Sequence, residues 1–187
     1  MDVPPPLPLD QARLRRIRSS GIPLMVAAAR ASAGESAWME RIQGLSEPAR
    51  TLLEGPLGID TWVDADLIAE CLRHFAARTT MGSVPAALGA ETARMRSPEA
   101  FRTPESLLLA LPAMWAHAVE GGRLDVRLTG PGSAEVDVWA DWDVPFFFQH
   151  HLVNWLTHGL RLTGAQDPEV ACADAEPPRH AYRATWR

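Results

Sequence analysis

Three histidines lie in one aromatic stretch of the sequence, DWDVPFFFQHHLVNWLTHGLRLTG, which spans residues 141–164. Histidine is the commonest metal ligand in proteins, and two histidines on one helix share a metal when they are three or four positions apart. His150 and His151 are adjacent, His158 follows two helical turns later, and no carboxylate lies between them. This spacing does not predict a metal site.

Haem requires a single axial histidine in an apolar pocket, so the spacing leaves a haem site open as an alternative. The residues that could contact such a cofactor are His151, His158, Phe147, Phe148 and Trp155. The other interpretation is an amphipathic core helix over 145–163, and we favour it because one apolar face is continuous. That face contains Phe148, Leu152, Trp155, Leu156, Gly159 and Leu160.

Other reactive groups are scarce. The 18 basic residues are all arginines, which excludes a Schiff-base lysine and a P-loop lysine within this chain. Cys71 and Cys172 are far apart and have no metal-site spacing, so we expect two reduced thiols, with Cys71 on the buried stripe of a helix. We assign no catalytic residue, no metal and no cofactor, and we predict that the chain is not an enzyme.

Length and composition are those of one globular domain. The 187 residues are 47% hydrophobic and carry a net charge of −5. We expect a Pro/Arg-rich arm over residues 1–20 and a single α+β domain over 21–187. The proline-rich lead MDVPPPLPL is predicted to be extended, either as a tether to the body or as a segment that a partner recognises.

Charge and hydropathy limit the partners and the cellular location that the sequence allows. The arginines at 13, 15, 16 and 18 either touch an acidic partner or anionic lipid, or form a solvated helix face. The rest of the chain is acidic, which argues against a nucleic-acid surface. No stretch approaches the ~20 apolar residues of a membrane span, so we expect no stable membrane insertion and a cytoplasmic location.

The sequence predicts mainly helices from residue 10 to residue 121. Short helices are predicted over 10–18 and 23–33, followed by ESAWMERIQGL and EPARTLLEG. A stronger helix begins after Asp64, and another is predicted in SVPAALGAETARMR. The segment from Thr103 to Gly121 predicts a helix that Thr103 caps, with Pro104 at its first position.

The period then changes from 3.6 to 2, which predicts strands near 122–129, 133–141, 169–175 and 180–186. Parity sets the first hairpin: a three-residue loop at 130–132 places Arg127 opposite Glu135 and Val126 opposite Val136. In a second hairpin, which turns at AEPP, His180, Tyr182, Ala184 and Trp186 share a face with Val170 and Cys172 opposite them. The predicted fold is α+β: a helical N-terminal half packed on a four-stranded antiparallel sheet of two hairpins joined by the long aromatic helix.

The segments from Trp62 to Trp186, among them WVDADLIAECLRHFAARTT and the run from LPAMWAHAVEGG to RHAYRATW, resemble a myxobacterial paralogous family of unknown function. That family in turn resembles, distantly, the four-vinyl-reductase and haem-NO-binding superfamily. The resemblance implies an α+β domain that holds a small molecule between helices and a sheet, often as a dimer. Most of the cysteines that mark many four-vinyl-reductase-like domains near the end are missing here, and only Cys172 remains, so the resemblance assigns no ligand.

From these features we expect a non-catalytic sensory or protein-interaction domain in cytoplasmic signalling or regulation, because the chain offers a core and faces but no reactive constellation. The alternative is a domain that binds a small apolar ligand or haem. Expected partners are another protein or a second copy of the chain, and a small apolar ligand in the alternative.

Overall fold

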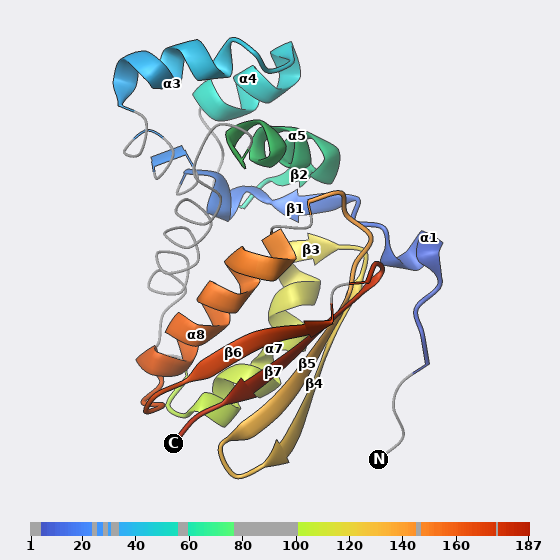
Figure 1. The fold of residues 1–187 in the computed structure, drawn as a ribbon. Coiled ribbons are helices and arrows are strands. Elements are labelled where there is room, and N and C mark those ends of the chain that lie inside the picture. The colour runs from blue at the N-terminus through green and yellow to red at the C-terminus, as the bar shows by residue number, and fades with distance from the viewer. Residues whose placement is uncertain are drawn as a thin grey trace.

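The computed structural model describes residues 5–23, 26–27, 30, 34–55, 60–76, 101–144, 147–174 and 176–187. Figure 1 shows the short helices and a small sheet at one end, and two longer helices against a larger sheet at the other. The helix predicted in SVPAALGAETARMR, and most of the one predicted over 23–33, fall outside the described residues.

The larger sheet is the predicted one. It contains β4 (Arg123–Gly130), β5 (Ser133–Trp139), β6 (Glu169–Asp174) and β7 (Arg179–Thr185), all antiparallel, in the order β4-β5-β7-β6. Arg127 pairs with Glu135 and Val126 with Val136, which confirms the register expected from parity. The predicted three-residue loop at 130–132 is wrong, because Gly130 pairs with Ser133 and the register shifts between Leu128 and Gly130. In the second hairpin Val170 pairs with Ala184, and Cys172 with Tyr182.

One face of this sheet is the core. Helix α7 (Pro104–Ala118) and helix α8 (Val153–Leu162) pack on it, and Thr103 begins α7 with the predicted cap, here a reciprocal capping box with Ser106. The two helices approach closely at Gly159, where an added Cβ would lie 2.9 Å from Leu107 Cδ2. The inward side chains of the strands are buried: Leu124, Ala134, Val136, Val138, His180, Tyr182 and Ala184.

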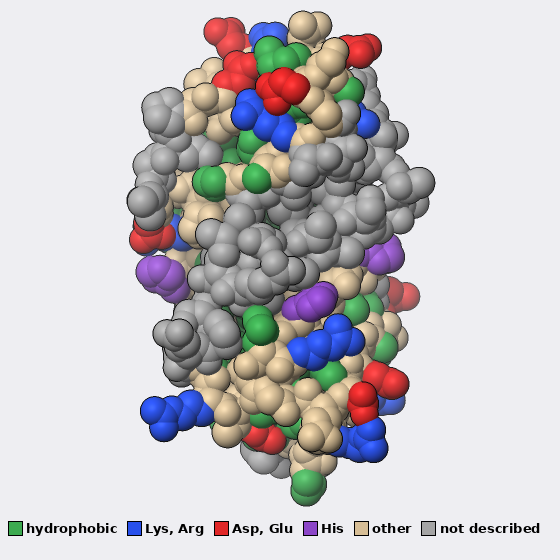
Figure 2. Space-filling view, turned by 90° about the vertical axis from the view of Figure 1, so that its left-hand side faces the viewer, with side chains coloured by type: hydrophobic (Ala, Val, Ile, Leu, Met, Phe, Trp, Pro, Cys, Tyr) green, Lys and Arg blue, Asp and Glu red, His purple; other side chains and the backbone are tan. Residues whose placement is uncertain are grey.

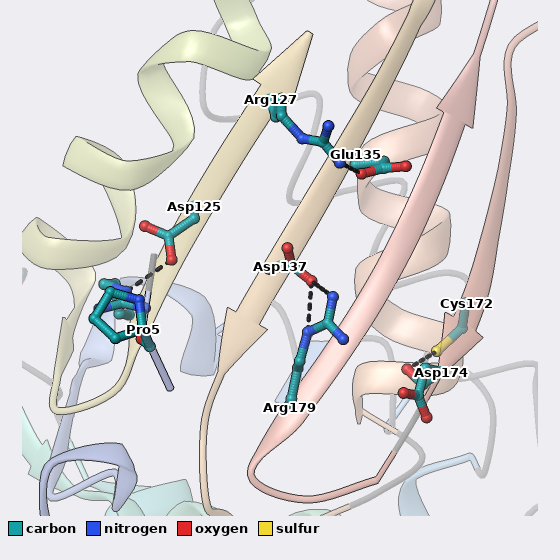
Figure 3. Close-up of polar contacts among 9 residues, drawn as sticks. Pro5, Asp125, Arg127, Glu135, Asp137, Cys172, Asp174 and Arg179 are labelled. Atoms are coloured by element: carbon teal, nitrogen blue, oxygen red, sulfur yellow. Dashed lines mark hydrogen bonds and ion pairs between the residues drawn. The ribbon is translucent and has the colours of Figure 1, made fainter. Parts of the chain in front are cut away.

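The opposite face of the sheet carries charges that pair across and along the strands (Figure 3). Arg127 pairs with Glu135, and the guanidinium of Arg179 lies 2.7 Å from the carboxylate of Asp137. Arg123 pairs with Asp125 on its own strand at 2.7 Å. Exposed pairs of this kind contribute little to stability, so they mainly fix the side-chain positions.

The N-terminal half contains helices α3 (Glu35–Ile42), α4 (Glu47–Glu54) and α5 (Ala65–Ala76). The Asp64 side chain accepts a hydrogen bond from the backbone N–H of Asp66, as expected for the cap of α5. Trp38 of α3 stacks on Phe75 of α5 with ring centroids 5.3 Å apart. Cys71 is fully buried, which confirms its place on the apolar stripe.

The helix predicted over 10–18 is wrong for its second half. After α1 (Leu9–Ala12) the chain forms strand β1 (Arg16–Arg18), which is followed by a 3₁₀ turn, Ser19–Gly21. Strand β1 pairs antiparallel with β2 (Trp62–Asp64) on one side and β3 (Val119–Glu120) on the other. Pairing with distant segments overrides the local preference for helix.

Gly121 makes room for this second sheet. Its φ is +102°, and an added Cβ would lie 2.1 Å from the carbonyl oxygen of Arg13. Helix α7 ends at Ala118, and the chain continues as β3 beside the N-terminal segment before it reaches Gly121. Only glycine combines this backbone conformation with so close an approach.

The basic run does not form a helix face, because Arg16 and Arg18 lie on strand β1, and three of its four arginines pair with carboxylates. Arg16 pairs with Glu120, and Arg18 pairs with Asp60 at 3.5 Å while its guanidinium lies 4.2 Å from the centroid of the Trp62 ring. Arg13 lies 3.4 Å from Asp66. Neighbouring carboxylates therefore offset much of the local positive charge.

We predict that Trp155→Ala lowers the free energy of unfolding by about 3–5 kcal/mol, because this tryptophan is 9% exposed on the apolar face of α8. The control is His158→Ala, on the half-buried flank of the same helix, which should cost less than half as much. Chemical denaturation of both variants measures the difference. Equal losses would contradict the assignment of the two faces.

Candidate functional site: an aromatic cluster at the start of helix α8

The aromatic helix begins as a π-helix. Residues Phe147–Leu152 form this wider helix, and α8 continues from Val153. The sequence predicted one regular helix over the whole stretch. π-Helical turns are rare and frequently occur at functional sites, which makes this segment the first candidate for a site.

Aromatic rings gather around the π-helix. Phe147 and Phe148 meet edge to face at 5.4 Å, and Trp142 makes an edge contact with each of them. His151 stacks on Phe147 at 4.7 Å and His180 stacks on Phe148 at 3.9 Å. The structure thus brings together three of the predicted site residues, Phe147, Phe148 and His151.

The other two predicted residues lie further along α8. Trp155 is buried and His158 is half-buried, and both lie beyond the π-helical segment, on the regular part of α8. Sequence reasoning did not assign Trp142, His180 or Tyr182 to a site. Alternation placed His180 and Tyr182 on one face of a strand, but no signal in the sequence indicated that this face meets Phe148.

Two hydrogen bonds attach the cluster to its surroundings. The Tyr182 hydroxyl donates to the carbonyl oxygen of Phe148 at 2.9 Å, which fixes the π-helix to strand β7. The Trp142 indole donates to the carbonyl oxygen of Ala65 at 3.1 Å, which connects the cluster to the start of α5. The cluster therefore lies where the two halves of the molecule meet.

His180 is the most unusual polar group of the cluster. It is 2% exposed, and neither of its ring nitrogens makes a well-formed hydrogen bond, although the ring interacts with the backbone of Ala140. Burial lowers the pKa of His180, and the backbone of Ala140 and the charge of Asp174 only partly oppose this. The ring is consequently neutral at pH 7.

Each of the other five histidines either interacts with another group of the protein or is exposed to solvent. His74 donates from Nε2 to the carbonyl oxygen of Arg41 at 2.6 Å, and Gly44 leaves room for its ring. His117 and His150 are exposed. His151 and His158 are half-buried, and each interacts with another group of the protein.

The thiols and the tyrosine are poor nucleophiles and poor anionic ligands. Burial raises the pKa of the Cys71 thiol to about 12 and also raises the pKa of Cys172, which donates a hydrogen bond to the carbonyl oxygen of Asp174. Burial likewise raises the pKa of Tyr182. All three groups are therefore protonated at neutral pH, and thiolate chemistry requires the opposite shift.

The histidine, cysteine and tyrosine side chains are the groups that could bind a metal ion or haem iron. All six histidines, both cysteines and the single tyrosine lie in the described residues, and no group of three His, Cys, Asp or Glu there could hold a metal ion. Figure 2 shows histidine side chains apart from one another on one face. Most of these donors are engaged, exposed or protonated. His180 is the exception, because its ring nitrogens make no well-formed hydrogen bond, but its ring is 2% exposed and stacked on Phe148 at 3.9 Å. The described residues therefore assign no axial ligand for haem.

The protein resembles known proteins in its structure but not in its sequence. No family model and no curated protein matches the sequence. Solved H-NOX structures do match: a Cs H-NOX carrying 4-cyano-L-phenylalanine (TM-score 0.69, 9% identity, 91% of this chain and 97% of that one) and a T. tengcongensis H-NOX point mutant (0.66, 10%, 89% and 95%).

The unliganded Fe(II) H-NOX from K. algicida is similar to the same degree, with a TM-score of 0.69, 6% identity, and coverage of 91% of this chain and 97% of that one. Its name refers to iron, and another of the matching structures addresses haem distortion in the H-NOX family. At such low identity the likeness shows the fold alone. The chain has an α+β fold like that of H-NOX domains.

We predict that the folded protein loses stability at acid pH because His180 is buried in the cluster. Because the pKa of His180 is lower in the folded protein than the ordinary 6.5, its contribution to stability is complete above pH 6.5 and is lost as pH falls below that value. We expect the melting temperature to fall between pH 7.5 and 5.5, and His180→Phe to reduce this fall.

The matched control is His150→Phe, on the exposed side of the same aromatic segment, which should leave the pH profile unchanged. Thermal melts across this range measure both variants. A profile that keeps its slope in His180→Phe would assign the acid sensitivity to other groups.

Proposed function

We propose that this chain is a non-catalytic sensory domain that binds a small apolar ligand within an H-NOX-like fold. The likeness to H-NOX structures over nine-tenths of the chain is the observation that carries the proposal. The protonated thiols and tyrosine, and the lack of a metal-binding group among the described residues, support a role in binding rather than in chemistry.

The donor chemistry favours a ligand other than haem. Haem proteins bind iron through an axial histidine, thiolate or tyrosinate. Here these side chains are engaged, exposed or protonated, except that of His180, whose neutral ring is buried and stacked on Phe148. Aromatic rings remain as the main binding groups. They contribute through apolar contact and stacking, which suits a planar apolar molecule.

Within the cluster, Phe147 and His151 are the accessible part. Both are half-buried, whereas Phe148, His180 and Tyr182 are buried beneath them. A ligand that stacks on the Phe147–His151 pair would lie over the π-helix and beside Trp142. Movement of this segment would then be transmitted to α5 through the Trp142–Ala65 hydrogen bond.

The cellular role stays part of the proposal. We propose that the domain acts in cytoplasmic signalling or regulation and passes its state to a protein partner or to a second copy of the chain. No helix in the described part of the chain is long and apolar enough to cross a membrane. The division into a Pro/Arg-rich arm over 1–20 and a single domain over 21–187 also remains a prediction.

Two porphyrins test the proposed binding. We expect metal-free protoporphyrin IX and its iron complex to bind the purified protein with similar affinity, because stacking does not use the iron. Phe147→Ala should weaken both about fivefold or more, since an aromatic contact is worth about 1 kcal/mol. Leu162→Ala, an exposed apolar residue at the end of α8, is the control and should change neither. Fluorescence quenching measures each affinity.

The absorption spectrum of the iron complex distinguishes the alternatives. Much tighter binding of the iron complex, with a Soret band shift that His151→Ala or His158→Ala abolishes, would establish a haem protein and overturn the apolar-ligand proposal. Absence of saturable binding by either porphyrin would count against a small-ligand site at the cluster.

A further inference from the structure

The outer face of the larger sheet contains one aromatic residue in an unusual setting. Val138 is directed into the core, so the next residue of β5, Trp139, lies on the outer face. Trp139 is nevertheless 9% exposed, and its indole N–H is buried and donates no hydrogen bond. A buried donor without an acceptor is costly, so this indole is suited to a carbonyl oxygen brought by another segment.

Two arginines flank this indole. In the register of the sheet, Trp139 pairs with Arg123 on one side and with Arg179 on the other. Their guanidinium groups lie 5.7 and 5.8 Å from the centroid of the tryptophan ring. Asp125 holds Arg123 at 2.7 Å, and Asp137 holds Arg179. The result is an aromatic surface bordered by oriented N–H donors.

The N-terminal arm already reaches this surface. Arg123 Nη2 donates to the carbonyl oxygen of Pro5 at 3.0 Å, across 118 positions of sequence. Figure 3 shows Pro5 beside Asp125 of β4. Pro8 has φ −56° and ψ 145°, which is close to polyproline II geometry, and Leu7 of the same segment is half-buried. The arm thus contacts the surface through a backbone carbonyl, the acceptor that an extended proline segment leaves unpaired.

We propose that Trp139 and Arg123 form a binding site for proline-rich segments in the polyproline II conformation, and that Pro5 of the chain's own arm occupies the Arg123 side of this site in cis, while the Trp139 indole keeps its N–H without an acceptor. Proline-rich segments bind other proteins in this way, with aromatic side chains receiving the rings and donors receiving the carbonyls. The partner is therefore a proline-rich peptide segment. This site lies on the face of the sheet opposite the aromatic cluster and does not depend on the proposed ligand.

A labelled peptide with the sequence MDVPPPLPLD tests the proposal on the full chain. In the wild-type protein the arm competes with the peptide. The double variant Pro5→Gly, Pro6→Gly weakens the arm, because glycine loses the preformed conformation. Fluorescence anisotropy should show peptide binding to the double variant about tenfold tighter than to the wild type. Equal binding to both proteins would overturn the arm's occupancy of the site.

Two arginines on one strand provide a matched pair of variants. Arg123→Ala in the double-variant background should weaken peptide binding about tenfold, the effect of losing a charge-assisted hydrogen bond. Arg127→Ala removes the same charge from the same face of β4 and should leave binding unchanged. Equal losses from both would indicate general charge attraction and overturn the site.

Two further measurements separate binding from folding. Far-UV circular dichroism and thermal melts confirm that each variant is folded. Trp139→Phe keeps an aromatic ring but lacks the indole N–H, so this variant should also bind the peptide more weakly. A peptide in which alanines replace the prolines should bind at least about tenfold more weakly, because it lacks the preformed extended conformation. Binding that ignores both changes would contradict recognition of polyproline II.

Discussion

The hydrogen bond from Tyr182 to the carbonyl of Phe148 joins the widest turns of the aromatic helix to the middle of the larger sheet. Phe148 can then stack on His180, two residues earlier on the same strand. Trp142 meets both phenylalanines and donates to Ala65 at the start of α5. One continuous series of contacts therefore leads from the sheet to the N-terminal helices, and the arrangement of the two halves depends on it.

Arginine has two roles in this lysine-free chain. Its planar group pairs with carboxylates and also stacks on aromatic faces, which an ammonium group does less well. Arg16 and Arg18 approach Trp62 while they pair with Glu120 and Asp60. The arginines beside Trp139 do the same on the larger sheet. Arginines of a basic sequence run can therefore pair with carboxylates and aromatic rings of the same chain, as Arg16 and Arg18 do.

The parts of the fold that could be predicted from the sequence are those with a regular local pattern. Both hairpins, the pairing of Arg127 with Glu135, and the caps at Asp64 and Thr103 follow from alternation, parity and side-chain hydrogen bonding over a few residues. Strand β1 was missed because three residues, with an arginine on each side of Ile17, carry no strand period. Its identity comes from partners far along the chain.

The candidate site was predicted in part for the same reason. The cluster at 147–151 is visible in the sequence because its members are neighbours, and the apolar face correctly placed Phe148 and Trp155 in the core. The π-helical geometry and the stack on His180 depend on how two separate elements meet. No local pattern reports such a contact, so Trp142, His180 and Tyr182 could only be found in the structure.

The small sheet also has a consequence for synthesis of the protein on the ribosome. Arg16 and its partner Glu120 are 104 positions apart, so strand β1 emerges long before β3 exists to cover its second edge. During that interval an uncovered strand could pair with other nascent chains. The arginines on both sides of Ile17 repel such encounters, because charged side chains beside an apolar residue act as gatekeepers against aggregation. The same charges that hold the folded sheet to its neighbours thus protect the chain while it is still incomplete.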